Sequence, residues 1–226
     1  MPENKLYEPH IIYRCVVGSR AYGLAGEGSD TDRRGFFLPP ASLHWSLGGV
    51  PDRLTNPETQ DCYWELKPFL LLALKATPNV LECLYTPLVE VATPLARELL
   101  AMRSAFLSKL AYPSYKGYVA SQVKKLGQDL RTRGEPKWKA AMHLARLLLS
   151  GIAVLREGRV PVRVDEHRDR LLAVRDGRVP WKEYHAWRSA LAGELEAAWS
   201  GSRLPDQPDY GRVEAFLLKA RRSVVG

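Results

Sequence analysis

The stretch that decides the fold is Val16-Val17-Gly18-Ser19-Arg20-Ala21-Tyr22-Gly23, followed after a short spacer by Gly28-Ser29-Asp30-Thr31-Asp32. Most residues of 10–17 are β-branched or aromatic, which predicts a buried strand that ends at Gly18. A second strand is predicted over 32–38, because the two prolines that follow it cannot continue a ladder. The sequence therefore predicts two strands joined by a glycine-rich excursion, with a Gly-Ser pair at its start and two aspartates at its end.

The two aspartates alternate in extended chain, so their carboxylates project from the same face. Adjacent carboxylates repel unless a cation neutralises them, and Mg²⁺ commonly binds one or two carboxylates together with substrate phosphates. Gly18 lets the backbone approach a phosphate closely, and Ser19 adds a hydroxyl and an amide donor. A plain turn explains Asp30 but neither Asp32 nor the Gly-Ser pair. The pattern therefore favours a metal-bound triphosphate held for in-line phosphoryl or nucleotidyl transfer.

This arrangement resembles the DNA polymerase β-type nucleotidyltransferase superfamily, and within it an uncharacterised bacterial and phage subgroup of predicted nucleotidyltransferases. The matching residues are Gly18, Ser19, Asp30 and Asp32, with Tyr22, Gly23 and Ser29 added in the subgroup. The resemblance implies that an NMP moves from an NTP to a hydroxyl acceptor with release of pyrophosphate. It also implies two Mg²⁺ ions, which Mn²⁺ can replace.

The family carries a third carboxylate on a strand beside the Asp-x-Asp strand. A third strand is predicted over 61–66, and its even spacing puts Asp61, Tyr63 and Glu65 on one face. We favour Asp61, because Glu65 precedes a predicted helix start, where the helix dipole alone favours a carboxylate. The expected catalytic and metal-binding set is therefore Asp30, Asp32 and Asp61, with Glu65 as the alternative third ligand.

Charge divides the chain unevenly. Residues 1–113 hold 11 basic and 12 acidic side chains, and residues 114–226 hold 22 and 13, so the whole net charge of +8 comes from the second half. Such asymmetry suggests that one half handles an anion. Strand patterns are predicted to end near residue 90, and helices to follow over 114–133, 136–155, 166–175, 180–199 and 208–223. We expect an α+β fold: a small mixed-sheet nucleotidyltransferase domain at 1–90 and an all-helical, basic domain at 91–226 that closes the nucleotide cleft.

Further nucleotide-binding candidates are polar residues near the motif or on one stripe of a predicted helix: Arg20, Ser29, Tyr118, Lys125, His143 and Arg146. Tyr118 is placed to stack on a base, and His143 with Arg146 to contact the triphosphate or base across a cleft. The alternative for each helical residue is a solvated helix face, and for Arg20 a surface arginine. Glu82 is interpreted as structural.

The segment 41–60 is rich in glycine and proline and is predicted as a loop. A helix is predicted from Pro68 to about residue 76, and Asn79 is expected to cap a short helix through Tyr85. The three cysteines lie in apolar segments, which predicts buried thiols in a reducing cytoplasm. The first residues do not resemble a signal peptide, and the longest apolar runs are too short to span a bilayer.

The acceptor is open on the sequence alone. An RNA 3′ end is supported by the basic second half. A protein hydroxyl that receives AMP or CMP and an antibiotic are the other enzymatic readings. A nucleotide- or nucleic-acid-binding module without catalysis is the alternative of a different class.

Overall fold

The computed structural model describes residues 2–225, apart from the side chains of residues 2–4 and 133. By packing, the chain forms two compact units. The first contains the chain up to Lys75, Asn79–Phe106 and the chain from Pro208 onward, and the second contains Ala76–Pro78 and Leu107–Gln207. The C-terminal segment thus joins the unit that we expected to be complete within residues 1–90.

A five-stranded mixed sheet forms the centre of the first unit. Its order is β3-β4-β2-β1-β5, with β2 and β4 parallel and the other neighbours antiparallel. The strands are β1 (Ile11–Val17), β2 (Asp32–Phe37), β3 (Arg53–Thr55), β4 (Cys62–Glu65) and β5 (Val89–Ala92). This mixed sheet, together with the many helices, confirms the α+β class.

Two strands and one helix of this unit were not predicted from the sequence. The predicted loop 41–60 contains α3 (Ala41–Trp45) and β3, and β5 lies at Val89–Ala92, where no strand was predicted. Both strands are three or four residues long and lie at the two edges of the sheet. Segments that short carry too few alternations to be recognised, and they are stabilised by pairing with β4 and β1.

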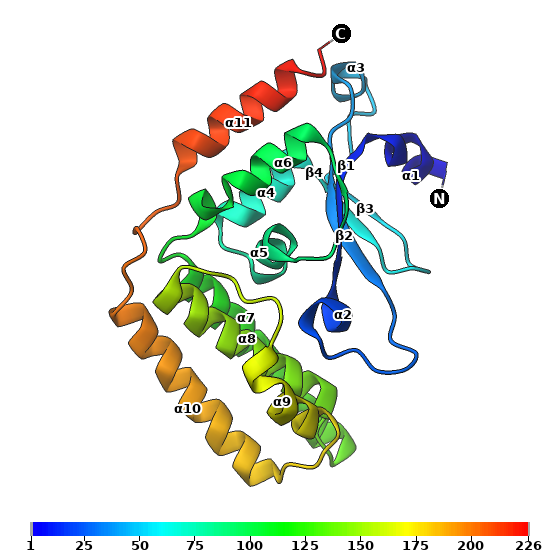
Figure 1. Cartoon of the computed structure of the whole chain (residues 1–226). Coiled ribbons are helices and arrows are strands. Elements are labelled where there is room, and N and C mark those ends of the chain that lie inside the picture. The colour runs from blue at the N-terminus through cyan, green and yellow to red at the C-terminus, as the bar shows by residue number, and fades with distance from the viewer. Residues whose placement is uncertain (1, 226) are drawn as a thin grey trace. The chain divides into compact units, whose positions relative to one another are not determined.

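Helices cover one face of the sheet, as Figure 1 shows for α4, α5 and α6. In the core on this side Tyr13 stacks on Phe36, with ring centroids 5.1 Å apart, and Phe69 packs against Phe36 in a tilted arrangement at 4.6 Å. Tyr7 of α1 packs against Phe37 from the other side, at 5.8 Å. The helices of this unit are α1 (Pro2–Tyr7), α2 (Gly18–Tyr22), α3, α4 (Leu66–Leu74), α5 (Pro78–Tyr85), α6 (Pro94–Ala101) and α11 (Tyr210–Arg222), with short 3₁₀ turns at Glu8–His10 and Arg103–Phe106.

Local signals explain where these helices begin. The carboxylate of Glu65 accepts a hydrogen bond from the backbone N–H of Lys67 at 2.9 Å and so caps α4. Helix α5 begins at Pro78, because a proline in the first turn is preorganised for a helix and has no N–H to satisfy. Asn79 therefore lies inside the helix, and the prediction that it is the N-cap is wrong.

The second unit is helical around α8, as predicted. Helix α8 packs against α7, α9 and α10 (Figure 1) and is buried along most of its length. Among the described residues α8 is the one helix with the length and apolar composition to cross a membrane, and 72% of its most apolar window is buried inside the protein. The elements are α7 (Ala111–Arg133), α8 (Trp138–Glu157), a 3₁₀ turn at Asp165–His167, α9 (Arg168–Arg175) and α10 (Trp181–Ser200).

Candidate active site

The candidate site lies where β1 ends and α2 begins. Val17, the last residue of β1, pairs with Asp32, the first residue of β2. Gly18 follows with φ +72°, in the left-handed region where residues with a side chain are strained. A Cβ atom at Gly18 would collide with the Oδ2 atom of Asp32. The glycine is therefore needed twice, for its backbone conformation and for the space that the carboxylate fills.

Local hydrogen bonds shape the loop that carries the two aspartates. The guanidinium of Arg20 donates to the backbone carbonyls of Ser29, at 2.7 Å, and of Asp30, at 3.3 Å. The Ser29 hydroxyl accepts from the backbone N–H of Gly26 at 2.9 Å. Arg20 and Ser29 thus hold the loop in this structure, and their contact with a nucleotide stays a prediction. Asp30 is exposed and Asp32 is half-buried.

Two buried hydrogen bonds connect the site to α5 and to the residue that follows it. The Tyr22 hydroxyl, at the end of α2, donates to the Glu82 carboxylate at 2.6 Å, and both side chains are buried. One turn later the Thr86 hydroxyl donates to the backbone carbonyl of Val16 at 2.9 Å. These two buried contacts fix α2 and the end of β1. The sequence led us to interpret Glu82 as structural, but it did not identify Tyr22 as its partner. The one signal for such a contact was a carboxylate within an otherwise apolar helix.

Strand register separates Asp61 from Asp32. In the parallel β2–β4 pair, Arg34 is the partner of Cys62, so these two side chains share a face. Asp32 lies two residues before Arg34 and shares that face, whereas Asp61 lies one residue before Cys62 and points to the other. The Asp61 carboxylate accepts a hydrogen bond from the Tyr63 hydroxyl at 3.4 Å. The structure therefore does not bring Asp61 to Asp32, contrary to our expectation of a shared metal ion.

Glu65 lies at the far end of β4, about 13 Å along the strand from Asp61. It is 4% exposed and forms an ion pair with Arg221 of α11 at 2.8 Å, in addition to capping α4. The same arginine contacts His44 at 2.7 Å, and burial together with the guanidinium lowers the pKa of that imidazole. Glu65 therefore caps α4 and holds α11 in this fold, and its role as a third metal ligand stays a prediction.

The carboxylates of Asp30 and Asp32 stay the candidate metal ligands. Within residues 2–225, those of Asp30 and Asp32 accept no hydrogen bond and form no ion pair, so no protein group neutralises them. Hard carboxylate oxygens suit Mg²⁺, which takes its other ligands from water and phosphates. Among the same described residues, no group of three or more His, Cys, Asp and Glu side chains is arranged to hold a metal. The protein's share of such a site would therefore be the two aspartates.

Comparison with known proteins agrees with this geometry. A family model described as "RlaP: RNA repair pathway DNA polymerase beta family" matches residues 3–219. The chain belongs to the RlaP family. It is also 28% identical over 160 residues to "Uncharacterized protein YcgL" of Bacillus subtilis (strain 168). That match covers 69% of this chain and 60% of the relative's length.

The nucleotide-binding candidates in the helical unit of this RlaP family member differ in their surroundings. Tyr118 and Lys125 are exposed on α7. On α8, His143 is largely buried, and burial with the neighbouring positive charges of Arg146 and Lys139 lowers its pKa to about 4. The imidazole is therefore neutral near pH 7. Arg146 is 5% exposed, so the solvated helix face we considered does not hold for it. A role in nucleotide binding stays a prediction for all four candidates.

Proposed function

We propose that the chain is a metal-dependent nucleotidyltransferase that moves an NMP from an NTP to a hydroxyl acceptor and releases pyrophosphate. The observation that supports this most is the Asp32 carboxylate seated against Gly18 at the start of α2, in a member of a DNA polymerase β family. Chemistry at a triphosphate needs both donors for its oxygens and carboxylates for its metal, and this end of the sheet has both.

Each residue has a separate task in this proposal. The first backbone N–H groups of α2 have no partner within the helix, so those at Gly18 and Ser19 are available to phosphate oxygens. The Ser19 hydroxyl adds a third donor. Asp30 and Asp32 would hold Mg²⁺, which supplies positive charge to the α-phosphate under attack and to the leaving pyrophosphate. The brace formed by Tyr22 keeps these donors in place, since α2 has only five residues.

We further propose an RNA 3′ end as the acceptor. The matching family is described by an RNA repair pathway, and the net charge of residues 114–226 is +9. Basic surface attracts a polyanion by releasing its condensed counterions. Binding of RNA should therefore weaken as salt rises, with the decrease set by the number of phosphates contacted.

The test is transfer of label from each α-labelled NTP, with Mg²⁺ and total RNA. The wild-type protein should label RNA. Asp32→Asn, which keeps the side-chain volume, should lower the rate by at least ~100-fold, because even partners behind a metal ligand cost about 10–100-fold. Glu27→Gln is the control, since it removes an exposed charge from the same loop.

Three outcomes would change the proposal. Undiminished transfer by Asp32→Asn contradicts the metal assignment. Label in protein or in a small molecule contradicts the RNA acceptor and leaves the transferase. Salt-sensitive RNA binding without pyrophosphate release identifies a binding module instead.

A further inference from the structure

The first unit carries a large pocket at the end of the sheet away from Asp32. Its volume is about 1100 Å³, and its walls come from α3, β3, β4, α4 and the end of α11, all within that unit. Glu65, a buried residue of the lining, pairs with Phe37, the last residue of β2. Phe37 lies five residues beyond Asp32 and therefore about 17 Å along the strand. The pocket thus lies apart from the candidate active site.

Apolar side chains that face solvent converge on this pocket. Trp45 is 74% exposed, Val225 53% and Leu71 48%, and all three belong to the lining. Trp64 adds a second, half-buried indole ring. Single apolar residues on a surface are common, but several around one hollow are typical of a binding site. The indole rings are large, flat and apolar, which suits a planar aromatic ligand.

The charged side chains of the lining leave a small positive excess. Glu65 and Arg221 neutralise each other through their ion pair at 2.8 Å. The other charged residues of the lining are Arg53, Lys67 and Asp52, and none of them forms an ion pair with a described residue. Two cations against one anion leave a single positive charge. That charge complements one phosphodiester, which carries a single negative charge.

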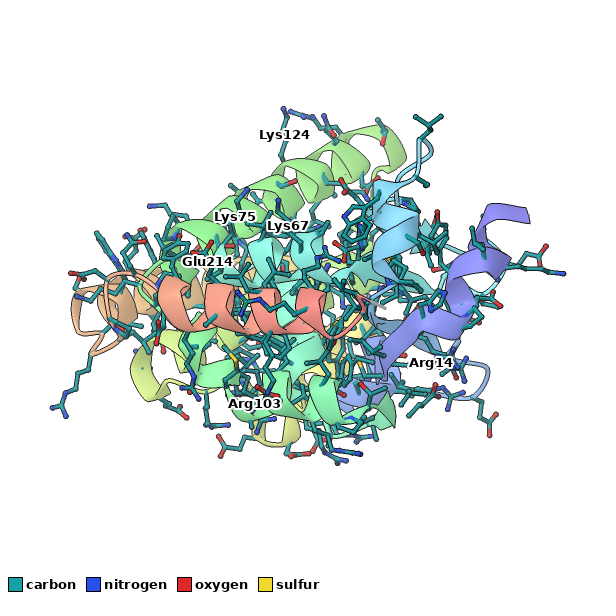
Figure 2. All side chains as sticks on the ribbon, turned by 90° about the horizontal axis from the view of Figure 1, so that it is seen from above. Arg14, Lys67, Lys75, Arg103, Lys124 and Glu214 are labelled. Carbon is teal, nitrogen blue, oxygen red and sulfur yellow. The ribbon has the colours of Figure 1, made fainter. Side chains whose placement is uncertain are left out.

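Each of these two cations lies next to an apolar wall. Arg53 and Trp64 are direct partners in the β3–β4 ladder, so their side chains share a face with Cβ atoms about 5 Å apart. Lys67 and Leu71 are four residues apart on α4 and are therefore neighbours on its surface. Figure 2 shows Lys67 at the start of α4, beside α11, with Lys75 at the other end of α4. Cations beside exposed aromatic rings are the combination that binds the backbone and the bases of a single strand.

We propose that this pocket binds one nucleotide of single-stranded RNA, with the base stacked on the Trp45 ring and the phosphodiester bound by Lys67 and Arg53. The pocket would hold RNA upstream of the 3′ end that accepts the NMP, so the proposal rests on the proposed function. Every base has a π-face, so the pocket accepts any of them. Double-stranded RNA is excluded, because its bases are stacked within the helix.

Fluorine NMR of protein labelled with 5-fluorotryptophan reads this pocket directly. Each of the six tryptophans gives a signal, and Trp45→Phe and Trp64→Phe assign the two that matter. In buffer without Mg²⁺, short oligo(A) should shift these two signals. An abasic oligomer of the same length and charge should shift them less and bind more weakly, because it has no base to stack. A blunt RNA duplex should leave them unchanged.

Variants separate stacking from charge. Trp45→Ala should weaken oligo(A) binding by roughly 5- to 100-fold, the loss expected when an aromatic that stacks on a base is removed, and should leave binding of the abasic oligomer unchanged. Lys67→Met should weaken both and lower the slope of log Kd against log salt by about 0.7, the value for one phosphate of a single strand. Leu47→Ala and Lys75→Met are the matched controls, because both positions are exposed and lie outside the lining.

Three results would overturn the proposal. They are unshifted Trp45 and Trp64 signals with oligo(A), equal binding of oligo(A) and the abasic oligomer, and self-association without RNA binding that Trp45→Ala abolishes, which would make the pocket a contact between two copies of the chain. Transfer of label to RNA with unshifted signals rejects the pocket and keeps the acceptor. Shifted signals without transfer to RNA reject the acceptor and keep the pocket as an RNA-binding site, so the two proposals fail separately.

Discussion

Replacement of Gly18 by alanine, compared with the same change at Gly28, tests the two reasons for a glycine at this position: its positive φ and the space that the Asp32 carboxylate fills. Its φ of +72° costs an L-residue about 1–2 kcal/mol. The new methyl group would also occupy the place of the Asp32 carboxylate, so that carboxylate must move. Gly28 supplies a matched control, since its φ is +75° and nothing lies within 4 Å of a Cβ atom there. Gly28→Ala pays only the backbone cost.

The assays are thermal unfolding and NMP transfer. In a chain of this size about 1–2 kcal/mol lowers Tm by roughly 2–8 °C. Gly28→Ala should show this loss, and Gly18→Ala should show at least as much. Transfer should fall by at least ~10-fold in Gly18→Ala, because a shift of even 1 Å at a reacting group is costly, and should be nearly unchanged in Gly28→Ala.

Equal transfer rates in the two variants would refute the reasoning, because the position of the Asp32 carboxylate against Gly18 would then have no effect on NMP transfer. A loss in both that follows their Tm values would show a stability effect alone. The distinction requires assays at a temperature where both variants are folded.

Three further changes test the packing. Tyr22→Phe removes the buried hydrogen bond to the Glu82 carboxylate and should lower the free energy of unfolding in urea by about 1–3 kcal/mol. The rate of NMP transfer should fall as well. An unchanged urea midpoint would contradict the role of this hydrogen bond in holding α2. The pKa of His143 is about 4 in the folded protein, below its unfolded value. Its contribution to stability is therefore complete above pH ~6.5 and is lost as pH falls toward 4. Unfolding measured at pH 7 and pH 4.5 should show that the stability of His143→Asn depends less on pH than that of the wild type. Arg221→Met leaves Glu65 buried without its cation and should cost about 3–5 kcal/mol. Lys219→Met, which removes an exposed pair on the same helix, should cost at most about 1 kcal/mol, and equal losses would refute the difference in burial.

The secondary structure of the motif region was predictable because its signals are local. The strand before Gly18 and the strand that begins at Asp32 are confirmed within one residue, and the long helices of the second unit within three. Helical periods in 136–155 place apolar groups on one face over many turns, which makes them hard to mistake. The short edge strands β3 and β5 had no comparable signal, since pairing rather than sequence pattern makes them strands.

The site was predictable only in part, for a reason that Asp61 illustrates. Sequence spacing places it on a strand with Tyr63 and Glu65, but the strand begins at Cys62, one residue after Asp61, whose carboxylate accepts a hydrogen bond from Tyr63. Which face it shares with Asp32 depends on the register of two strands far apart in the chain, and a slip of one residue reverses every side chain. Periodicity within each strand contains no information about that register.

The sequence alone determined the local chemistry: a strand that ends in Gly18 and Ser19, and a return strand that opens with Asp32. Backbone preference and alternation act over a few residues, so these features follow from residues next to one another. Tertiary structure decided the rest. It places the Asp32 carboxylate against Gly18 and puts Asp61 on the opposite face of the sheet. It also brings Arg221, near the end of the chain, into an ion pair with Glu65. Such contacts join residues that only packing and strand pairing bring together.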